Sequence, residues 1–270
     1  RLIHYGFVGG PNLFAQIEND LGKTSGIEWR LYGGHRLWHA PEHPIRTYYP
    51  DNAPVEIIEE GDTVRVIQPT ESISHIQKEM RLSFQNGAFH VEHRLTNQVI
   101  WPVELAIWAV TALGDHGVAI VPLPPRGTHA EHLQPTNTLT LWAYTDLSDP
   151  RCVWGREFIL VRQEPDNETP QKFGVRTPHA WAGCVVQNTL FLKQFDYRPQ
   201  SSYPDFDCNV EVYTDHRMIE VESLGPLVNL PPNQTITHHE TWNLIPDVPA
   251  PSNEEEVMEA IMPKIDALRA

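Results

Sequence analysis

Short alternating segments, separated by proline and glycine, constrain the fold of this chain more than any other sequence feature. The 270 residues include 24 prolines and 16 glycines, which are spread along the whole length rather than gathered in one linker. Proline breaks helices, and the intervals between such breaks suit short strands joined by turns. The pattern predicts an antiparallel β protein, and the length is sufficient for one large all-β domain.

Two β-hairpins are the clearest local predictions. Asn86-Gly87 separates two alternating runs, residues 76–84 and 89–95. This dipeptide favours a type I′ turn, because both turn positions need positive φ. A second hairpin is expected to join residues 55–60 to residues 63–68.

Other alternating segments predict the remaining strands. They are Val103–Leu113, Val118–Leu123, Thr138–Tyr144, Trp154–Val161, Gly183–Gln187, Leu190–Phe195, Cys208–Tyr213, Met218–Ser223 and Thr235–Leu244. Two long proline-rich segments, residues 121–136 and 162–181, are expected to be loops. Loops of this length in a compact domain often form the walls of functional sites.

The only helix that we expect is at the C-terminus. Residues 1–246 are interpreted as one β domain, and residues 247–270 as a linker and a helical tail. Ser252 is the expected N-cap, with Glu255 as its capping-box partner. Apolar residues then recur at helical spacing: Val257, Met258, Ile261, Ile265 and Leu268. We expect this stripe to dock on the β domain or on a second subunit, so a homo-oligomer formed through the helix is one hypothesis.

The acidic composition limits the partners. The net charge is -15, with 35 acidic and 20 basic side chains. Such a chain repels phosphate groups, so we expect neither nucleic acid nor an anionic membrane as a partner. No apolar run of about 18 residues predicts a membrane span. The compartment and the oligomeric state stay open.

No motif predicts a metal or a cofactor. The three cysteines lack CxxC spacing and are expected to be small buried side chains. The histidine pairs His129/His132 and His238/His239 have no third ligand at a suitable spacing. Nucleotide-binding and serine-hydrolase motifs do not occur.

Three glutamates on one face of a predicted strand pair are the candidates for catalysis. The expected register sets Glu211 opposite Glu220 and Asn209 opposite Glu222. In a partly closed cleft, such neighbours raise a carboxyl pKa, and a glutamate can then donate a proton near neutral pH. On an open surface they would form only a solvated acidic face. Lys193 is the expected counter-charge.

The stretch YGGHRLWHAPE, residues 32–42, supplies candidates for ligand binding. In an extended conformation Arg36 and Trp38 share one face, and His35 lies on the other. An indole can stack on the C–H faces of a sugar while a guanidinium reaches its hydroxyl oxygens. A polyhydroxylated ligand is therefore expected, bound by Arg36, Trp38 and Trp108, with Lys193 and Asn209 nearby.

Three segments resemble one superfamily. GGHRLWHAPE resembles the glycine-rich segment of aldose 1-epimerase and hexose-phosphate epimerase relatives. MIEVESLGPLVNLPPNQTITHHETW is similar to their glutamate-bearing strand and the strand that follows it. LFLKQFDYRPQSSYPDFDCNVEVYTD is similar to segments of a branch of the galactose mutarotase-like superfamily. The resemblance implies an all-β supersandwich of two large antiparallel sheets with a sugar cleft, here followed by a short C-terminal helix.

The resemblance also implies a reaction, the ring opening of an aldose. A glutamate takes the proton of the anomeric hydroxyl, while a histidine donates one to the ring oxygen. The glutamate falls on Glu222, with Glu220 as the nearest alternative. The strand that should carry the histidine departs from the pattern, because Trp108 stands there. The proton donor is then His35 or Glu211, or the cleft binds a sugar without this chemistry.

These residues leave several functions open. The first is a carbohydrate isomerase that uses glutamates as acid and base, and a lyase or hydrolase on the same cleft is a variant of it. The second is a non-catalytic carbohydrate-binding protein. The third is an assembly protein that acts through its C-terminal helix. Whether the sugar is free, phosphorylated or polymeric is not determined by the sequence.

Overall fold

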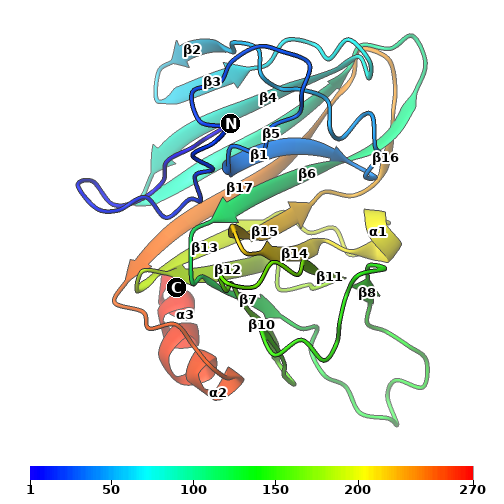
Figure 1. The fold of residues 1–270 in the computed structure, drawn as a ribbon. Coiled ribbons are helices and arrows are strands. Elements are labelled where there is room, and N and C mark those ends of the chain that lie inside the picture. The colour runs from blue at the N-terminus through cyan, green and yellow to red at the C-terminus, as the bar shows by residue number, and fades with distance from the viewer. Residues whose placement is uncertain (270) are drawn as a thin grey trace.

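The computed structural model describes residues 1–269, and two antiparallel sheets make up most of it (Figure 1). The first sheet contains, in order, β1 (Gly34–Ala40), β6 (Val103–Leu113), β15 (Met218–Leu224), β14 (Val210–Asp215), β11 (Gln171–Val175) and β8 (Leu139–Leu141), with β16 (Val228–Leu230) paired to β6. The second contains β2 (Glu56–Glu60), β3 (Thr63–Ile67), β4 (Ile76–Gln85), β5 (Ala88–Asn97), β17 (Thr235–Pro246), β13 (Thr189–Phe195), β12 (Trp181–Val186), β7 (Val118–Pro122), β10 (Phe158–Arg162) and β9 (Cys152–Trp154). The predicted all-β supersandwich of two large antiparallel sheets is confirmed.

The hairpins follow from their turn residues. Asn86 and Gly87 have φ values of 54° and 79°, and Gln85 pairs with Ala88 around them. In the other hairpin, Glu60 pairs with Thr63 around the two-residue turn. Both turns contain a glycine with positive φ, which glycine adopts without steric cost.

The largest difference from the sequence prediction is strand β11. Its residues lie inside a segment that the prolines predicted to be a loop. In the structure Phe173 and Val175 enter the core between the sheets, while Lys172 is on the opposite face. The expected strand at residues 154–161 is also split into β9 and β10 by a turn at Gly155.

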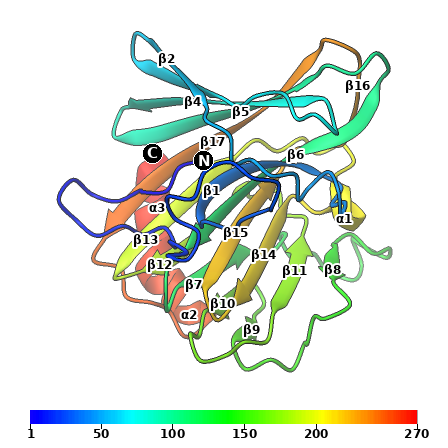
Figure 2. The same cartoon turned by 45° about the horizontal axis from the view of Figure 1, so that its top comes forward.

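Alternation within the seven-stranded sheet separates core residues from outward ones. Leu37 of β1, Ile107 of β6 and Val221 of β15 pack in the core between the sheets. Their neighbours Trp38 and Trp108 face the other way and belong to a separate cluster on the outer side. Figure 2 shows β15, β14, β11 and β8 of this sheet side by side across the view.

The buried ammonium group of Lys193 links the two sheets. Lys193 Nζ of β13 is 3.0 Å from Glu240 Oε1 of β17, and neither side chain is exposed. The same ammonium group donates to the backbone carbonyls of Ala109 and Val221, each at 3.1 Å. Because these carbonyls belong to β6 and β15, Lys193 ties the ten-stranded sheet to the backbone of two central strands of the other sheet.

A chain of neutral histidines lies beside this ion pair. His93 Nδ1 donates to the backbone carbonyl of His238 at 3.1 Å, so His93 Nε2 must accept from His35 Nε2 at 2.8 Å. His35 Nδ1 then accepts from the hydroxyl of Thr111 at 2.9 Å. Burial lowers the pKa of His35 and of His93 below the usual value, which keeps both imidazoles neutral.

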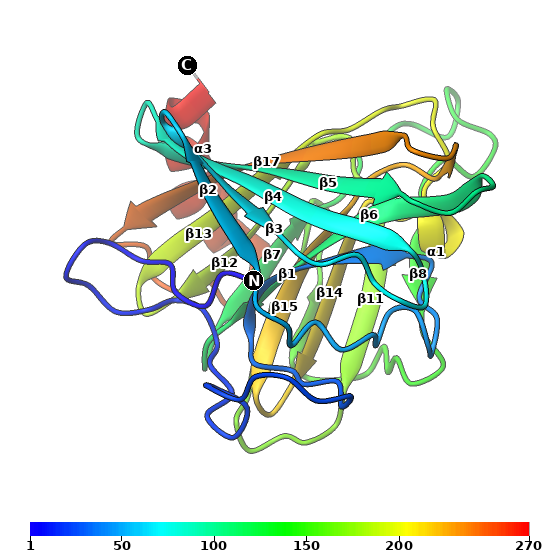
Figure 3. The ribbon, with the colours of Figure 1, turned by 90° about the horizontal axis from the view of Figure 1, so that it is seen from above.

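The C-terminal tail covers the outer face of the ten-stranded sheet. It consists of α2 (Glu254–Glu256), the π-helical turn η1 (Val257–Ile261) and α3 (Met262–Arg269). Val257, Ile261 and Ile265 are buried against strands β7, β10, β12 and β13, and Figures 1 and 3 show the tail on this side of the molecule. The predicted stripe is therefore docked on the β domain of the same chain, although Met258 and Leu268 are about half exposed.

Two details of the tail correct the prediction. The N-cap is Asn253 and not Ser252, because the Asn253 side chain accepts from the backbone N–H of Glu256. Ser252 instead donates its hydroxyl to the Glu256 carboxylate.

One short helix, α1 (Pro204–Asp207), also lies inside the β domain, where it precedes β14. In the described part of the chain, no helix is long and apolar enough to cross a membrane.

The buried histidines predict a loss of stability in weak acid. Burial lowers the pKa of His238 from 6.5 to about 4. Between these values the unfolded chain binds a proton that the native protein does not, so stability falls as the pH drops from 6.5 toward 4. The shift corresponds to a loss on the order of 3 kcal/mol. We expect His238→Gln, which can still donate to the Ser223 hydroxyl, to flatten this part of the pH profile in urea denaturation. An unchanged slope would contradict the assignment.

Candidate functional site

A cavity of about 410 Å³ lies on the outer face of the seven-stranded sheet. Its walls are mainly aromatic: Trp29, Trp38, Tyr48, Trp108, Trp142, Tyr144 and Tyr213. Its charged lining residues are Glu42, Lys172, Arg217, Glu220 and Glu222. Strands β1, β6, β11, β14 and β15 form the floor, because their outward side chains converge there, and loops on either side form the rim.

Lys172 is the central cation of this site. Its Nζ lies 2.8 Å from Glu211 Oε2 and 3.2 Å from Glu222 Oε2. The same Nζ lies 4.7 Å from the ring centroids of Trp108 and Trp142, a distance typical of cation–π contacts. Although burial acts to lower it, the two carboxylates raise the pKa of Lys172 well above its usual value. The side chain is therefore a permanent cation.

Glu222 has one oxygen engaged and one free. Its Oε2 accepts from Trp108 Nε1 at 2.6 Å and from Lys172 Nζ at 3.2 Å. Its Oε1 is buried and has no hydrogen-bond partner within residues 1–269. Glu222 lines the cavity, so this unpartnered oxygen is a candidate acceptor for a ligand bound there.

Glu211 lies beside Lys172 and is fully buried. Burial, together with the charge of Glu222, raises the pKa of Glu211 well above its usual value, against the opposite effect of Lys172. Gly174, its partner across the β11–β14 pair, leaves space for it, because a Cβ at Gly174 would lie 3.2 Å from Glu211 Cγ and 2.6 Å from Cys208 Sγ. Glu211 therefore shares Lys172 with Glu222 and holds its own proton more tightly than a free glutamate does.

Glu220 lies on the cavity wall, two residues before Glu222 on the same face of β15. Its carboxyl group forms no hydrogen bond or ion pair with a side chain among residues 1–269. Burial and, second, the charge of Glu222 raise the pKa of Glu220 to about 8. Glu220 is thus largely protonated at neutral pH, beside a carboxylate with a free oxygen.

The register of this strand pair differs from the prediction. Glu211 pairs with Glu222, and Glu220 pairs with Tyr213, so the pairing of Glu211 with Glu220 was wrong. The turn consists of His216 and Arg217. The Asp215 carboxylate accepts from the backbone N–H of Arg217 at 2.8 Å, which stabilises the turn at this position. The three glutamates still share a face, since the shift is an even number of residues.

Two predicted ligand-binding residues make contacts within the protein instead of lining the cavity. Arg36 is buried, and its guanidinium contacts Asp51 and donates to the Arg30 carbonyl at 2.5 Å. Asn209 donates to the Thr177 carbonyl and accepts from its N–H, at 2.9 and 2.8 Å. Both side chains are occupied within the protein, and neither lines the cavity.

Two further candidates, His35 and Lys193, lie between the two sheets and away from the cavity. His35 belongs to the neutral histidine chain between the sheets, because it alternates with Arg36 along β1. It cannot share the cavity with Trp38. Lys193 pairs with Glu240 in the interior and is not the counter-charge of the catalytic candidates. Among the predicted residues, Trp38, Trp108, Glu220 and Glu222 do line the cavity.

Sequence reasoning missed Lys172 and the loop residues of the rim. Lys172 is part of β11, where the flanking prolines concealed a short alternation of Lys172, Phe173, Gly174 and Val175. Trp29 reaches the cavity from the N-terminal segment, where its ring centroid lies 6.1 Å from that of Trp38. The alternation at β11 could have identified Lys172, whereas no local signal identifies Trp29.

His35, His93 and Glu240 are close enough to hold a metal ion, since one ligand atom of each lies within 4.8 Å of the others. Each of these atoms already has a partner. The two imidazole Nε2 atoms contact each other, and Glu240 Oε2 accepts from Trp242 Nε1 at 2.8 Å. Lys193 also neutralises Glu240. We therefore assign this cluster a structural role.

Neither a protein-family model nor a curated protein sequence matches the chain. Several solved structures match the chain in fold. The Slr1438 protein of Synechocystis sp. PCC 6803 aligns with a TM-score of 0.52 and 9% identity, over 87% of this chain and 85% of that one. A TPR-domain containing protein from Parabacteroides distasonis aligns with a TM-score of 0.54 and 15% identity, over 90% of this chain and 42% of that one.

Structures with lower TM-scores include a putative aldose 1-epimerase from Escherichia coli K12, at 0.46 and 12% identity over 86% of this chain and 81% of that one. At such identities the comparisons bear on the fold alone. The chain has the two-sheet, all-β architecture that the sequence predicted, and the Slr1438 protein shares this fold.

Removal of the central cation should destabilise the site in a pH-dependent way. We expect Lys172→Met to lower the free energy of unfolding by about 3 kcal/mol at pH 8, because it leaves Glu222 buried without a counter-charge. The loss should be smaller at pH 5, where the carboxyl groups can take up protons. Urea denaturation of Lys172→Met and of Lys172→Met/Glu211→Gln measures the effect. Equal losses at both pH values would contradict the ion-pair assignment.

Proposed function

We propose that the protein binds a carbohydrate in the aromatic cavity and interconverts the anomers of an aldose, with Glu222 as base and Glu220 as acid. The observation that carries this proposal is the pair of carboxyl groups on one face of β15, within a cavity walled by indole and phenol rings. The sequence segments that resemble aldose 1-epimerase relatives include this strand, which further supports it.

The aromatic walls suit a sugar ring. Trp38 and Trp108 pack edge to face, with ring centroids 5.0 Å apart, and Trp142 lies across Lys172 from Trp108. Pyranose rings expose C–H groups on their faces, and these pack on aromatic rings. Sugar hydroxyl groups can donate to Oε1 of Glu222, which has no hydrogen-bond partner among residues 1–269.

The two glutamates suit the two proton transfers of ring opening. The ionised Glu222 takes the proton of the anomeric hydroxyl through Oε1, while its Oε2 stays bonded to Trp108 and Lys172. Glu220 gives its proton to the ring oxygen. The bond between the anomeric carbon and the ring oxygen breaks, and an open-chain aldehyde forms. After rotation of the aldehyde, the reverse transfers close the ring to the other anomer and restore both groups.

A non-catalytic carbohydrate-binding function is the second candidate. The observation that favours it is Trp108, which stands where the resemblance implies an acid histidine and whose Nε1 donates to Glu222. In that case the glutamates would only accept hydrogen bonds from sugar hydroxyls. Anomer exchange measured on a bound sugar separates the two functions.

Loss of the base should abolish turnover and leave binding. We expect Glu222→Gln to slow anomer exchange by a factor of about 10²–10⁴, because general acid–base groups contribute that much. The amide keeps the shape of the side chain, so sugar affinity should change little. NMR exchange spectroscopy on a sugar identified by thermal-shift screening provides the measurement. Exchange at the wild-type rate would remove Glu222 from the mechanism.

The pH profile should identify the acid. The pKa of Glu220 is raised to about 8, so this group loses its proton above that pH. The rate of anomer exchange should therefore fall as the pH rises through about 8, since the proton donor is then ionised. Glu220→Gln should lower the rate and remove this decline. A decline that persists in Glu220→Gln would assign it to another group.

A further inference from the structure

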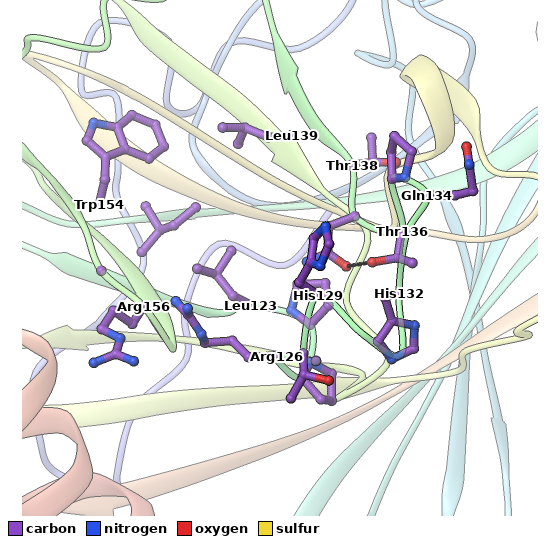
Figure 4. Close-up of a pocket in the computed structure, with 18 residues that line it drawn as sticks. Leu123, Arg126, His129, His132, Gln134, Thr136, Thr138, Leu139, Trp154 and Arg156 are labelled. Carbon is purple, nitrogen blue, oxygen red and sulfur yellow. Dashed lines mark hydrogen bonds between the residues drawn. The ribbon is translucent and has the colours of Figure 1, made fainter.

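A second and larger cavity, of about 900 Å³, lies where the edges of the two sheets come together. The segment between β7 and β8 forms one wall, and the turn between β9 and β10 forms the other. Figure 4 shows Arg126, Arg156 and Trp154 toward one end of this cavity, and His129 and His132 toward the other. None of the residues that line the aromatic cavity takes part in it.

The charge of this cavity is opposite to that of the protein. The chain has 35 acidic residues and a net charge of -15, yet no Asp or Glu is among the 18 residues that line the cavity. The lining residues include two arginines and two histidines. Neither arginine pairs with a carboxylate in the part of the chain that the structure describes. The two guanidinium groups can attract an anion into the cavity, although Glu131, Glu157 and Glu254 lie next to its lining residues.

The wall that carries Arg156 and Trp154 is rigidly built. Glu254 Oε2 accepts from the backbone N–H groups of Arg156 and Glu157, at 2.7 and 2.9 Å. Glycine is required at position 155, because a Cβ there would lie 2.5 Å from the backbone carbonyl oxygen of Phe158. The Glu254 carboxylate binds backbone N–H groups and forms no ion pair with the Arg156 guanidinium among residues 1–269.

Trp154 gives this wall a flat apolar surface. Its Nε1 donates to the Leu147 carbonyl at 3.1 Å, and its ring packs edge to face on Phe173, with the centroids 5.2 Å apart. These contacts fix the indole at the end of the core. Leu123 and Ile159 line the cavity beside it. An apolar ring could stack there, within reach of guanidinium groups that bind carboxylates or sulfonates.

We propose that this second cavity is a binding site for an organic anion with a flat apolar body, such as an aromatic carboxylate or sulfonate. Trp154, Leu123 and Ile159 contact the apolar body, and Arg126 and Arg156 bind the acidic group. The proposal does not depend on the carbohydrate function, because the two cavities share no lining residue.

Calorimetric titration with two matched probes tests the proposal. Naphthalene-2-sulfonate should bind at least about tenfold more tightly than the neutral naphthalene-2-methanol, because only the sulfonate can pair with the arginines. The preference should weaken in high salt, which screens charges at exposed sites. Equal affinities, or no measurable binding of the sulfonate, would overturn the proposal.

Variants locate the site. Arg126→Gln/Arg156→Gln should remove most of the preference for the sulfonate, a loss of about tenfold, and leave the affinity for the neutral probe nearly unchanged. Arg162→Gln, at the end of strand β10 and outside the cavity, is the matched control and should retain the preference. Thermal unfolding of each variant checks that it is folded. A preference that survives the double substitution, or that Arg162→Gln also abolishes, would overturn the assignment.

Discussion

The ammonium group of Lys172 allows two glutamates to face each other in the floor of the aromatic cavity. Glu211 and Glu222 are directly paired across β14 and β15, where like charges repel. Lys172, from the next strand, contacts both carboxyl groups, and Trp108 donates to one of them. One oxygen of Glu222 is fixed in this way, and the other has no hydrogen-bond partner in the described part of the chain. The raised pKa of Glu220 depends on the same negative charge.

Strand β15 is held from behind by the buried network between the sheets. Its outward residue Glu222 belongs to the cavity, while its inward neighbour Ser223 donates to Glu240 at 2.5 Å. Lys193 binds the Val221 carbonyl of the same strand. A buried ion pair adds little net stability, but its geometry fixes the groups around it. The candidate site therefore rests on a strand whose backbone position is determined on both faces.

Two cavities of different chemistry occupy one domain. The cavity on the outer face of the seven-stranded sheet combines aromatic rings with carboxyl groups, which suits hydroxyl-bearing ligands. The cavity at the sheet edges combines an indole with arginines and contains no acidic residue. The two cavities share no lining residue, so a ligand in one does not occupy the other. The long loop between β7 and β8, which the sequence predicts to be the wall of a functional site, lines only the second.

Local sequence determined the strands, the tight turns and the faces of the side chains. Asn86-Gly87 fixes one hairpin, and alternation brings Glu220 and Glu222 to one face, because turn chemistry and side-chain direction are local properties. The turn at Asp215 is also local, and it pairs Glu211 with Glu222. Tertiary structure decided which strands became neighbours. The position of Lys172 beside them depends on β11 as a sheet neighbour of β14, and segments distant in the chain become neighbours only when the sheets form a common core.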